Sequence, residues 1–168
     1  RRLQIPEDDA LLMCIGSENW RKGFDETLDA FAHWQAAEPA PGRATLVFVG
    51  CRNQARFRGL ARRYGIERQT RFLRESRPIA NVLAGADALM LLSWYDACSR
   101  VVLEATRLGV PSITTATNGA AEALRDGAGV VVSSPRSVAE IAAAPTEPAA
   151  PGRRRRYRRA CAAATAGP

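Results

Sequence analysis

The feature that most constrains the fold of this chain is a series of short apolar runs separated by stretches with helical spacing. The runs cover residues 10–16, 45–50, 70–73, 88–93, 111–115 and 129–133. Short apolar runs that alternate with amphipathic helices are typical of parallel strands buried on both faces. We therefore predict an α/β fold, a Rossmann-like doubly wound parallel sheet of about six strands in a three-layer sandwich.

The spacing of apolar residues also predicts where the helices and the domain end. Helices are expected from Asp25 to the residues before Pro39, and over 53–64, 79–86 and 101–109. Residues 1–140 should form one Rossmann-like domain. Residues 141–168 are rich in Ala and Pro and then in Arg, so we predict a linker followed by a basic C-terminal helix or tail.

The positive charge of the chain is concentrated at its end. Six of the 24 Lys and Arg residues lie in 153–159, so the rest of the chain carries 18 basic and 17 acidic side chains. This nearly neutral body argues against a nucleic-acid-binding protein. The tail itself is either a solvated helix face or a contact to anionic lipid or nucleic acid.

Cysteine and histidine usage narrows the chemistry. The four Cys show no CxxC spacing, no signal peptide is evident and no run of about 18 apolar residues occurs, so we predict a reducing, cytoplasmic setting. Cys14 and Cys51 fall in or beside apolar runs and should act as small hydrophobes. His33 is the only histidine, which excludes a histidine triad or a histidine-rich metal site.

Polar clusters follow five of the predicted strands. They read GSENWRKG, GCRNQ, LRESR, SWYDACSR and TATNGAAE. Ligands of such sheets bind at the carboxyl ends of the strands, beside a switch point, and we predict a site there. The sequence has no GxGxxG, no GxxxxGK[ST] and no DxD pair, so it lacks the fingerprints of dinucleotide sites, of P-loops and of metal-held sugar diphosphates.

Two of these clusters can form an anion site. Arg21 and Lys22 are adjacent cations, and Gly23 lets the backbone approach closely. Ser99 is a candidate N-cap, so the N–H groups from Ser99 to Val101 could meet a pyrophosphate if the first and fourth strands are neighbours. The alternative for the cations is an exposed basic turn.

Acidic and small residues complete the candidate site. Glu104 could accept two hydrogen bonds from a ribose diol, or be a surface acid of the helix; Asp96 could face the ligand, or cap a turn. Asn118 and Gly119 could adopt positive φ and present backbone amides to the ligand. The alternative for these two residues is a capping loop.

The residues that carry these features resemble a known family. RKG at 21–23, GADALMLLSWYDACSRVVLEATRLGVPSITT at 85–115 and NGAAE at 118–122 resemble the C-terminal, donor-binding domain of GT-B fold retaining glycosyltransferases of family 4, the glycosyl transferases group 1. Within this family the chain is similar to lipopolysaccharide glucosyltransferases. The resemblance covers roughly residues 1–140.

The resemblance implies a role for each candidate residue. The E-x7-E motif of the family maps onto Asp96 and Glu104, so that Glu104 would bind ribose hydroxyls and Asp96, one methylene shorter than Glu, would face the donor sugar. The diphosphate would lie against cations and backbone amides, and the base beside residues 73–77. The implied donor-site residues are Gly16, Arg21, Lys22, Arg74, Cys98, Ser99, Arg100, Val101, Glu104, Asn118 and Gly119.

The implied activity is transfer of a hexose from a nucleotide-diphosphate sugar, expected to be a UDP-sugar, with retention and without a metal or other cofactor. The acceptor would be a glycan or a lipid-linked glycan, on the cytoplasmic side and in part at an anionic membrane surface. Such enzymes carry a further N-terminal domain, so this chain is expected to be the C-terminal half and inactive alone. The alternatives are a non-catalytic remnant or split-enzyme subunit and, further off, nucleic-acid binding through the Arg-rich tail.

Overall fold

The computed structural model describes residues 3–17, 20–37, 43–75, 78–125, 127–144 and 159–162. The strands are β1 (Ala10–Ile15), β2 (Ala44–Val49), β3 (Thr70–Leu73), β4 (Ala88–Leu91), β5 (Ser112–Thr115) and β6 (Gly129–Val132). The α-helices are α1 (Phe24–Gln35), α2 (Gln54–Arg63), α3 (Ile79–Ala84), α4 (Arg100–Arg107) and α5 (Val138–Ala143). Three short 3₁₀ turns are η1 (Trp20–Lys22), η2 (Glu67–Gln69) and η3 (Gly119–Leu124).

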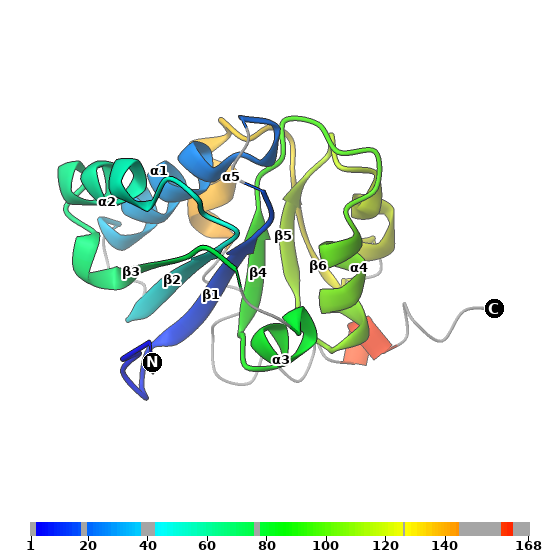
Figure 1. Cartoon of the computed structure of the whole chain (residues 1–168). Helices are drawn as coiled ribbons and strands as arrows, with labels where there is room; N and C mark the ends of the chain where they lie inside the picture. The colour runs from blue at the N-terminus through cyan, green and yellow to red at the C-terminus, as the bar shows by residue number, and fades with distance from the viewer. Residues whose placement is uncertain are drawn as a thin grey trace.

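All six strands belong to one parallel sheet of order β3-β2-β1-β4-β5-β6. The chain first builds from β1 to β3 at one edge, then returns to place β4 beside β1 and continues to the other edge. Helices α1, α2 and α5 cover one face of the sheet, and α3 and α4 cover the other (Figure 1). This arrangement confirms the predicted Rossmann-like, doubly wound fold.

The burial of the strands explains why their sequences are apolar without alternation. Every residue of β2, β4 and β5 is buried, as expected for central strands that helices cover on both sides. The edge strand β3 instead alternates, with Thr70 and Phe72 buried. The run predicted as a strand over 88–93 leaves the sheet after Leu91, where the polar loop begins.

An aromatic cluster joins α1 and α2 to the sheet. The rings of Phe24, Phe48, Phe57 and Phe72 lie with centroids 5.1 to 6.3 Å apart. Cys14 and Cys51 are also fully buried in this core, which confirms their role as small hydrophobes. Burial raises the pKa of the Cys14 thiol well above its ordinary value.

The body of the fold continues beyond the boundary predicted at residue 140. That boundary falls inside α5, which packs on α1, and Ile141 and Ala144 are buried in a second core cluster. Residues 159–162 also contact the body, because the buried Cys161 thiol donates a hydrogen bond to the Ala128 carbonyl at 3.4 Å. The linker and most of the Arg-rich tail lie outside the described residues.

Candidate functional site

The switch point of the sheet lies between β1 and β4. These strands are neighbours, with Leu12 beside Ala88 and Met13 beside Leu89. The chain leaves β1 toward α1 on one face and β4 toward α4 on the other, so the two loops diverge from the carboxyl ends of neighbouring strands (Figure 1). The neighbouring of the first and fourth strands, on which the anion site depended, is therefore confirmed.

A glycine brings the loop after β1 against the end of β4. Gly23 has φ 63°, and a Cβ atom there would lie 1.8 Å from the carbonyl oxygen of Leu92, so no other residue fits. The backbone N–H of Trp94 also donates a hydrogen bond to the Arg21 carbonyl at 2.8 Å. These contacts place Arg21 and Lys22 beside the loop that follows β4.

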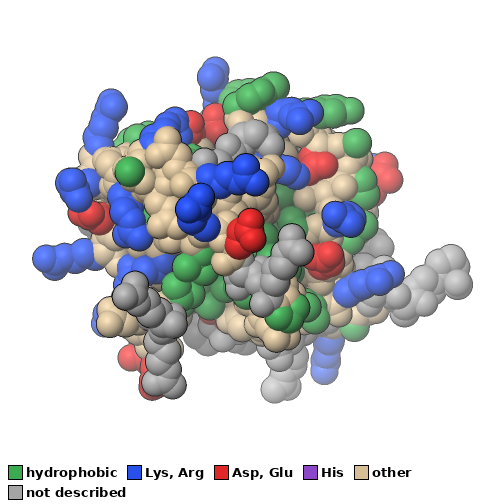
Figure 2. Space-filling view, viewed as in Figure 1, with side chains coloured by type: hydrophobic (Ala, Val, Ile, Leu, Met, Phe, Trp, Pro, Cys, Tyr) green, Lys and Arg blue, Asp and Glu red, His purple; other side chains and the backbone are tan. Residues whose placement is uncertain are grey.

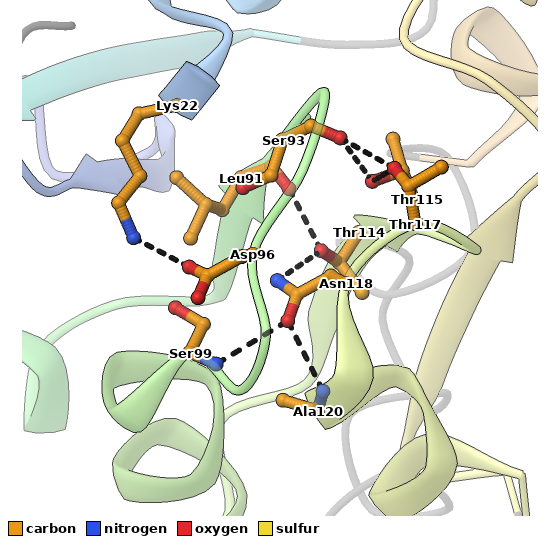
Figure 3. A network of polar contacts seen from close by, with 10 residues as sticks. All are labelled: Lys22, Leu91, Ser93, Asp96, Ser99, Thr114, Thr115, Thr117, Asn118 and Ala120. Atoms are coloured by element: carbon orange, nitrogen blue, oxygen red, sulfur yellow. Dashed lines mark hydrogen bonds and ion pairs between the residues drawn. The ribbon is translucent and has the colours of Figure 1, made fainter.

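The side chains of Lys22 and Asp96 form an ion pair between the loops that follow β1 and β4. Lys22 Nζ lies 2.5 Å from Asp96 Oδ2, although 74 residues separate them (Figure 3). Their side chains retain 23% and 14% exposure, so both remain within reach of a ligand. Arg21 is exposed on the same 3₁₀ turn, η1. The structure thus brings together the two loops that sequence analysis assigned to one site.

Threonine hydroxyls hold the loop over residues 93–99. Thr115 Oγ1 and Thr117 Oγ1 both donate hydrogen bonds to the Ser93 carbonyl, at 2.5 and 2.8 Å (Figure 3). The Asp96 N–H donates to the Thr117 carbonyl at 3.3 Å. The sequence placed Thr115 and Thr117 in the polar cluster TATNGAAE but predicted no role for their hydroxyl groups; the Thr-rich stretch SITTATN, which begins with β5, was the available signal.

The side chain of Asn118 holds this loop in place, which agrees with the alternative of a capping loop that the sequence left open. Its side chain is 1% exposed, and its Oδ1 accepts hydrogen bonds from the N–H groups of Ser99 (3.3 Å) and Ala120 (3.1 Å). Its Nδ2 donates to Thr114 Oγ1 at 3.0 Å, so both the oxygen and the nitrogen of the carboxamide are hydrogen-bonded (Figure 3). The predicted positive φ is wrong, because φ of Asn118 is −100°.

Gly119 is needed for close packing of two loops. Its N–H donates a hydrogen bond to the Asp96 carbonyl at 2.9 Å, and an added Cβ would lie 2.0 Å from the Ala97 carbonyl oxygen. It is absent from the described glycines with positive φ, which corrects the second half of the same prediction. Asn118 and Gly119 therefore contribute by holding the loop that carries Asp96. Neither of them needs a positive φ to do so.

At the N-terminus of α4, fewer backbone N–H groups are available to a ligand than the sequence predicted. Ser99 occupies the N-cap position, but its side chain makes no capping hydrogen bond, and its N–H is taken by Asn118. The first hydrogen bond within the helix is donated by Val102, so Arg100 and Val101 hold the N–H groups that precede it. Cys98, Arg100 and Glu104 are exposed, with Glu104 about one turn into α4.

A hollow of about 330 Å³ lies at the carboxyl ends of β1, β2 and β3. It brings together Gly16 and Arg74, two of the predicted donor-site residues, with Glu75 from the segment 73–77 that was expected beside the base. Arg52 is the residue that was not predicted here. The lining residues of the hollow are Ile15, Gly16, Ser17, Val49, Gly50, Arg52, Arg74, Glu75 and Ile79. A Cβ at Gly16 would lie 3.7 Å from the Lys22 side chain, so the hollow adjoins the turn that carries Lys22.

Three further observations concern metal binding, membrane spanning and the histidine. In the part of the chain that the structure describes, no three His, Cys, Asp or Glu side chains are grouped closely enough to hold a metal ion. None of the described helices is both long enough and apolar enough to cross a bilayer. His33 lies on α1 with an exposed side chain, and its Nδ1 is 3.0 Å from the Asp29 carbonyl oxygen.

Comparison with known proteins adds independent evidence. Lipopolysaccharide glucosyltransferase WaaG of Escherichia coli K12 is 30% identical over 138 residues, which is 82% of this chain, and glycogen synthase of Mycobacterium tuberculosis is 32% identical over 157 residues, 89% of this chain. A crystal structure of WaaG superposes with a TM-score of 0.84 at 27% identity, covering 94% of this chain and 42% of that one. The structure of Anabaena HepE in complex with UDP-glucose shares the fold, with a TM-score of 0.73 at 21% identity, over 95% of this chain and 44% of that one.

These matches cover most of this chain but only part of its relatives. The chain spans 36% of the length of WaaG and 37% of that of glycogen synthase. The family model described as glycosyl transferases group 1 matches residues 1–148. Together with the parallel sheet and the paired loops at its switch point, this match shows that the chain belongs to the family of glycosyl transferases group 1.

Proposed function

We propose that this chain binds the nucleotide-diphosphate sugar of a metal-independent, retaining hexosyltransferase. The observation that carries the proposal is the contact between the loops that follow β1 and β4, where Lys22 faces the loop that leads into α4. A cation on one side and a helix N-terminus on the other suit a diphosphate, because both favour negative charge. The family membership of the chain supports the same chemistry.

The parts of the donor can be assigned to neighbouring parts of the site. The diphosphate would lie between Arg21, Lys22 and the N–H groups of Arg100 and Val101. The nucleoside would take the adjoining hollow of about 330 Å³, beside Arg74. Glu104 would accept hydrogen bonds from the ribose, and Asp96 from the sugar. The complex of HepE with UDP-glucose favours UDP as the nucleotide.

The chemistry that follows is mainly electrostatic. As the bond between sugar and phosphate breaks, negative charge develops on the diphosphate, and Lys22, Arg21 and the N–H groups at the start of α4 would stabilise it. No step in this scheme requires a metal or a covalent cofactor. Since the chain spans only 36% of WaaG, we propose that transfer to a glycan or lipid-linked acceptor also needs an acceptor-binding domain, and that the isolated chain is inactive.

Titration calorimetry with UDP, in buffer containing EDTA, tests the donor site. Lys22→Ala and Arg21→Ala should each weaken binding by about 1–3 kcal/mol, since each removes a charge-assisted contact to phosphate. Arg63→Ala is the matched control: Arg63 is exposed in the last turn of α2, and its loss should leave the affinity unchanged. Unchanged affinity in Lys22→Ala, or binding that appears only with added Mg²⁺, would overturn the proposal.

A further inference from the structure

The ammonium group proposed to bind the diphosphate is already bound to a carboxylate of the chain. Lys22 Nζ and Asp96 Oδ2 are in contact at 2.5 Å. We infer that Asp96 is a specificity-determining residue that competes with the diphosphate for Lys22, so that the site favours a nucleotide sugar over the free nucleotide. The inference rests on the proposed function and concerns the exchange of partners within that site.

The exchange involves side chains alone, because both backbones are fixed. The Asp96 backbone donates to Thr117 and accepts from Gly119, at 3.3 and 2.9 Å. The turn before Lys22 is tied to the loop by the hydrogen bond from Trp94 to Arg21, and Gly23 packs directly on Leu92. Lys22 can therefore turn toward a phosphate on its long side chain, whereas Asp96 has a short side chain on a fixed backbone and keeps its carboxylate close to the same place.

That fixed carboxylate makes a free nucleotide diphosphate a poor ligand. When phosphate oxygens take Lys22, the Asp96 carboxylate loses its cation and faces a second negative group close by. With a side chain that is only 14% exposed, it is poorly compensated by water. The free nucleotide must therefore displace one anion from Lys22 and then tolerate it as a neighbour.

A sugar on the diphosphate removes this cost. Its hydroxyl groups can donate hydrogen bonds to the Asp96 carboxylate and so replace the ammonium that moves to the phosphate. After transfer the hydroxyls leave with the sugar, and Asp96 again competes for Lys22. The same contact thus favours binding of the donor and release of the nucleotide product.

The first test measures UDP and UDP-glucose binding to Asp96→Asn by titration calorimetry. The variant should bind UDP about fivefold more tightly, the upper value for an exposed ion pair, because Lys22 no longer has a charged competitor. UDP-glucose should gain less or lose affinity, so the preference for the sugar nucleotide falls. Glu67→Gln is the control, since it removes one negative charge from the Arg62–Glu67 ion pair near η2.

The second test combines Asp96→Asn with Lys22→Ala. If Asp96 acts through Lys22, most of the gain in UDP affinity disappears in the double variant, and only the part due to direct repulsion between carboxylate and phosphate remains; a gain of undiminished size overturns the inference. Asp96→Ser is measured in parallel, with circular dichroism of each variant, so that misfolding of one is recognised. Loss of binding in Lys22→Ala without any gain in the Asp96 variants refutes the exchange only. Failure of the wild type to bind UDP-glucose and GDP-mannose as well as UDP, GDP and ADP refutes the donor site and the exchange with it.

Discussion

The carboxamide of Asn118 is buried and connects three parts of the site with one side chain. It joins the N–H at the start of α4, the N–H of Ala120 and the Thr114 hydroxyl, which in turn donates to the Leu91 carbonyl at 2.8 Å. Loss of a buried amide whose oxygen and nitrogen are both hydrogen-bonded is costly, because its buried partners are left without hydrogen bonds. Asn118 therefore controls the anion site by positioning its backbone.

Replacing Asn118 by Ala should lower the free energy of unfolding by about 2–3 kcal/mol, since buried N–H groups of Ser99 and Ala120 lose their acceptor. Urea unfolding followed by circular dichroism measures the change. Asn81→Ala, at an exposed position of α3, should shift stability by about 0.5 kcal/mol or less. An equal effect of the two substitutions would contradict the positioning role.

Sequence analysis could find the residues of the site but not their pairing. Lys22 and Asp96 stood out because each follows an apolar run, yet their contact depends on β1 lying next to β4. The same limit applies to Asn118, because an NG pair after a strand fits a ligand loop as well as a buried tie. Burial decided between these alternatives, and burial is a property of the assembled molecule.

At the scale of elements, the strands were predictable and the last helix was not. Runs such as ALLMCI and ATLVFV are buried on both faces and therefore apolar throughout, which single sequences reveal. Helix α5 has the sequence VAEIAA, followed by Ala and Pro, and this composition suggested a linker. Its place comes from packing on α1, through a contact that no local pattern encodes.

Ile141 tests whether α5 belongs to the core. Its side chain is 1% exposed in the cluster that also contains Met90, Leu92 and Ile113. Ile141→Ala should therefore reduce the free energy of unfolding by about 2–4 kcal/mol, by loss of buried area and creation of a cavity. Leu108→Ala, where the side chain is 41% exposed, provides the comparison in the same urea titration. If Ile141→Ala lowers the free energy of unfolding no more than Leu108→Ala does, the result would support a domain that ends at residue 140.

At the scale of the whole molecule, the charge of the described body is mixed. Acidic side chains lie among the basic ones on the visible face, although the basic ones are more numerous over the left half of the view (Figure 2). The excess of positive charge belongs to residues 153–159, of which the structure describes only Arg159. Contact of this tail with an anionic membrane, near lipid-linked acceptors, stays a prediction, as does the cytoplasmic setting.

The four cysteines report on the integrity of the whole fold. Cys98 is exposed, whereas Cys14, Cys51 and Cys161 are buried in elements from both ends of the chain. Burial raises the pKa of Cys161 to about 11 and that of Cys14 further, so at pH 8 both remain protonated and unreactive thiols. Iodoacetamide should then modify one thiol per native chain, at Cys98.

In 8 M urea all four thiols should react, because unfolding removes both the shielding and the shift in pKa. Mass spectrometry of the alkylated chain counts the modified residues, and Cys98→Ser should leave the native protein unmodified. The most informative thiol is that of Cys161, because its hydrogen bond to Ala128, just before β6, links residues 159–162 to the body of the fold. Rapid native labelling of Cys161 would show that this end does not pack on the body, whereas labelling of Cys14 would contradict the fold itself.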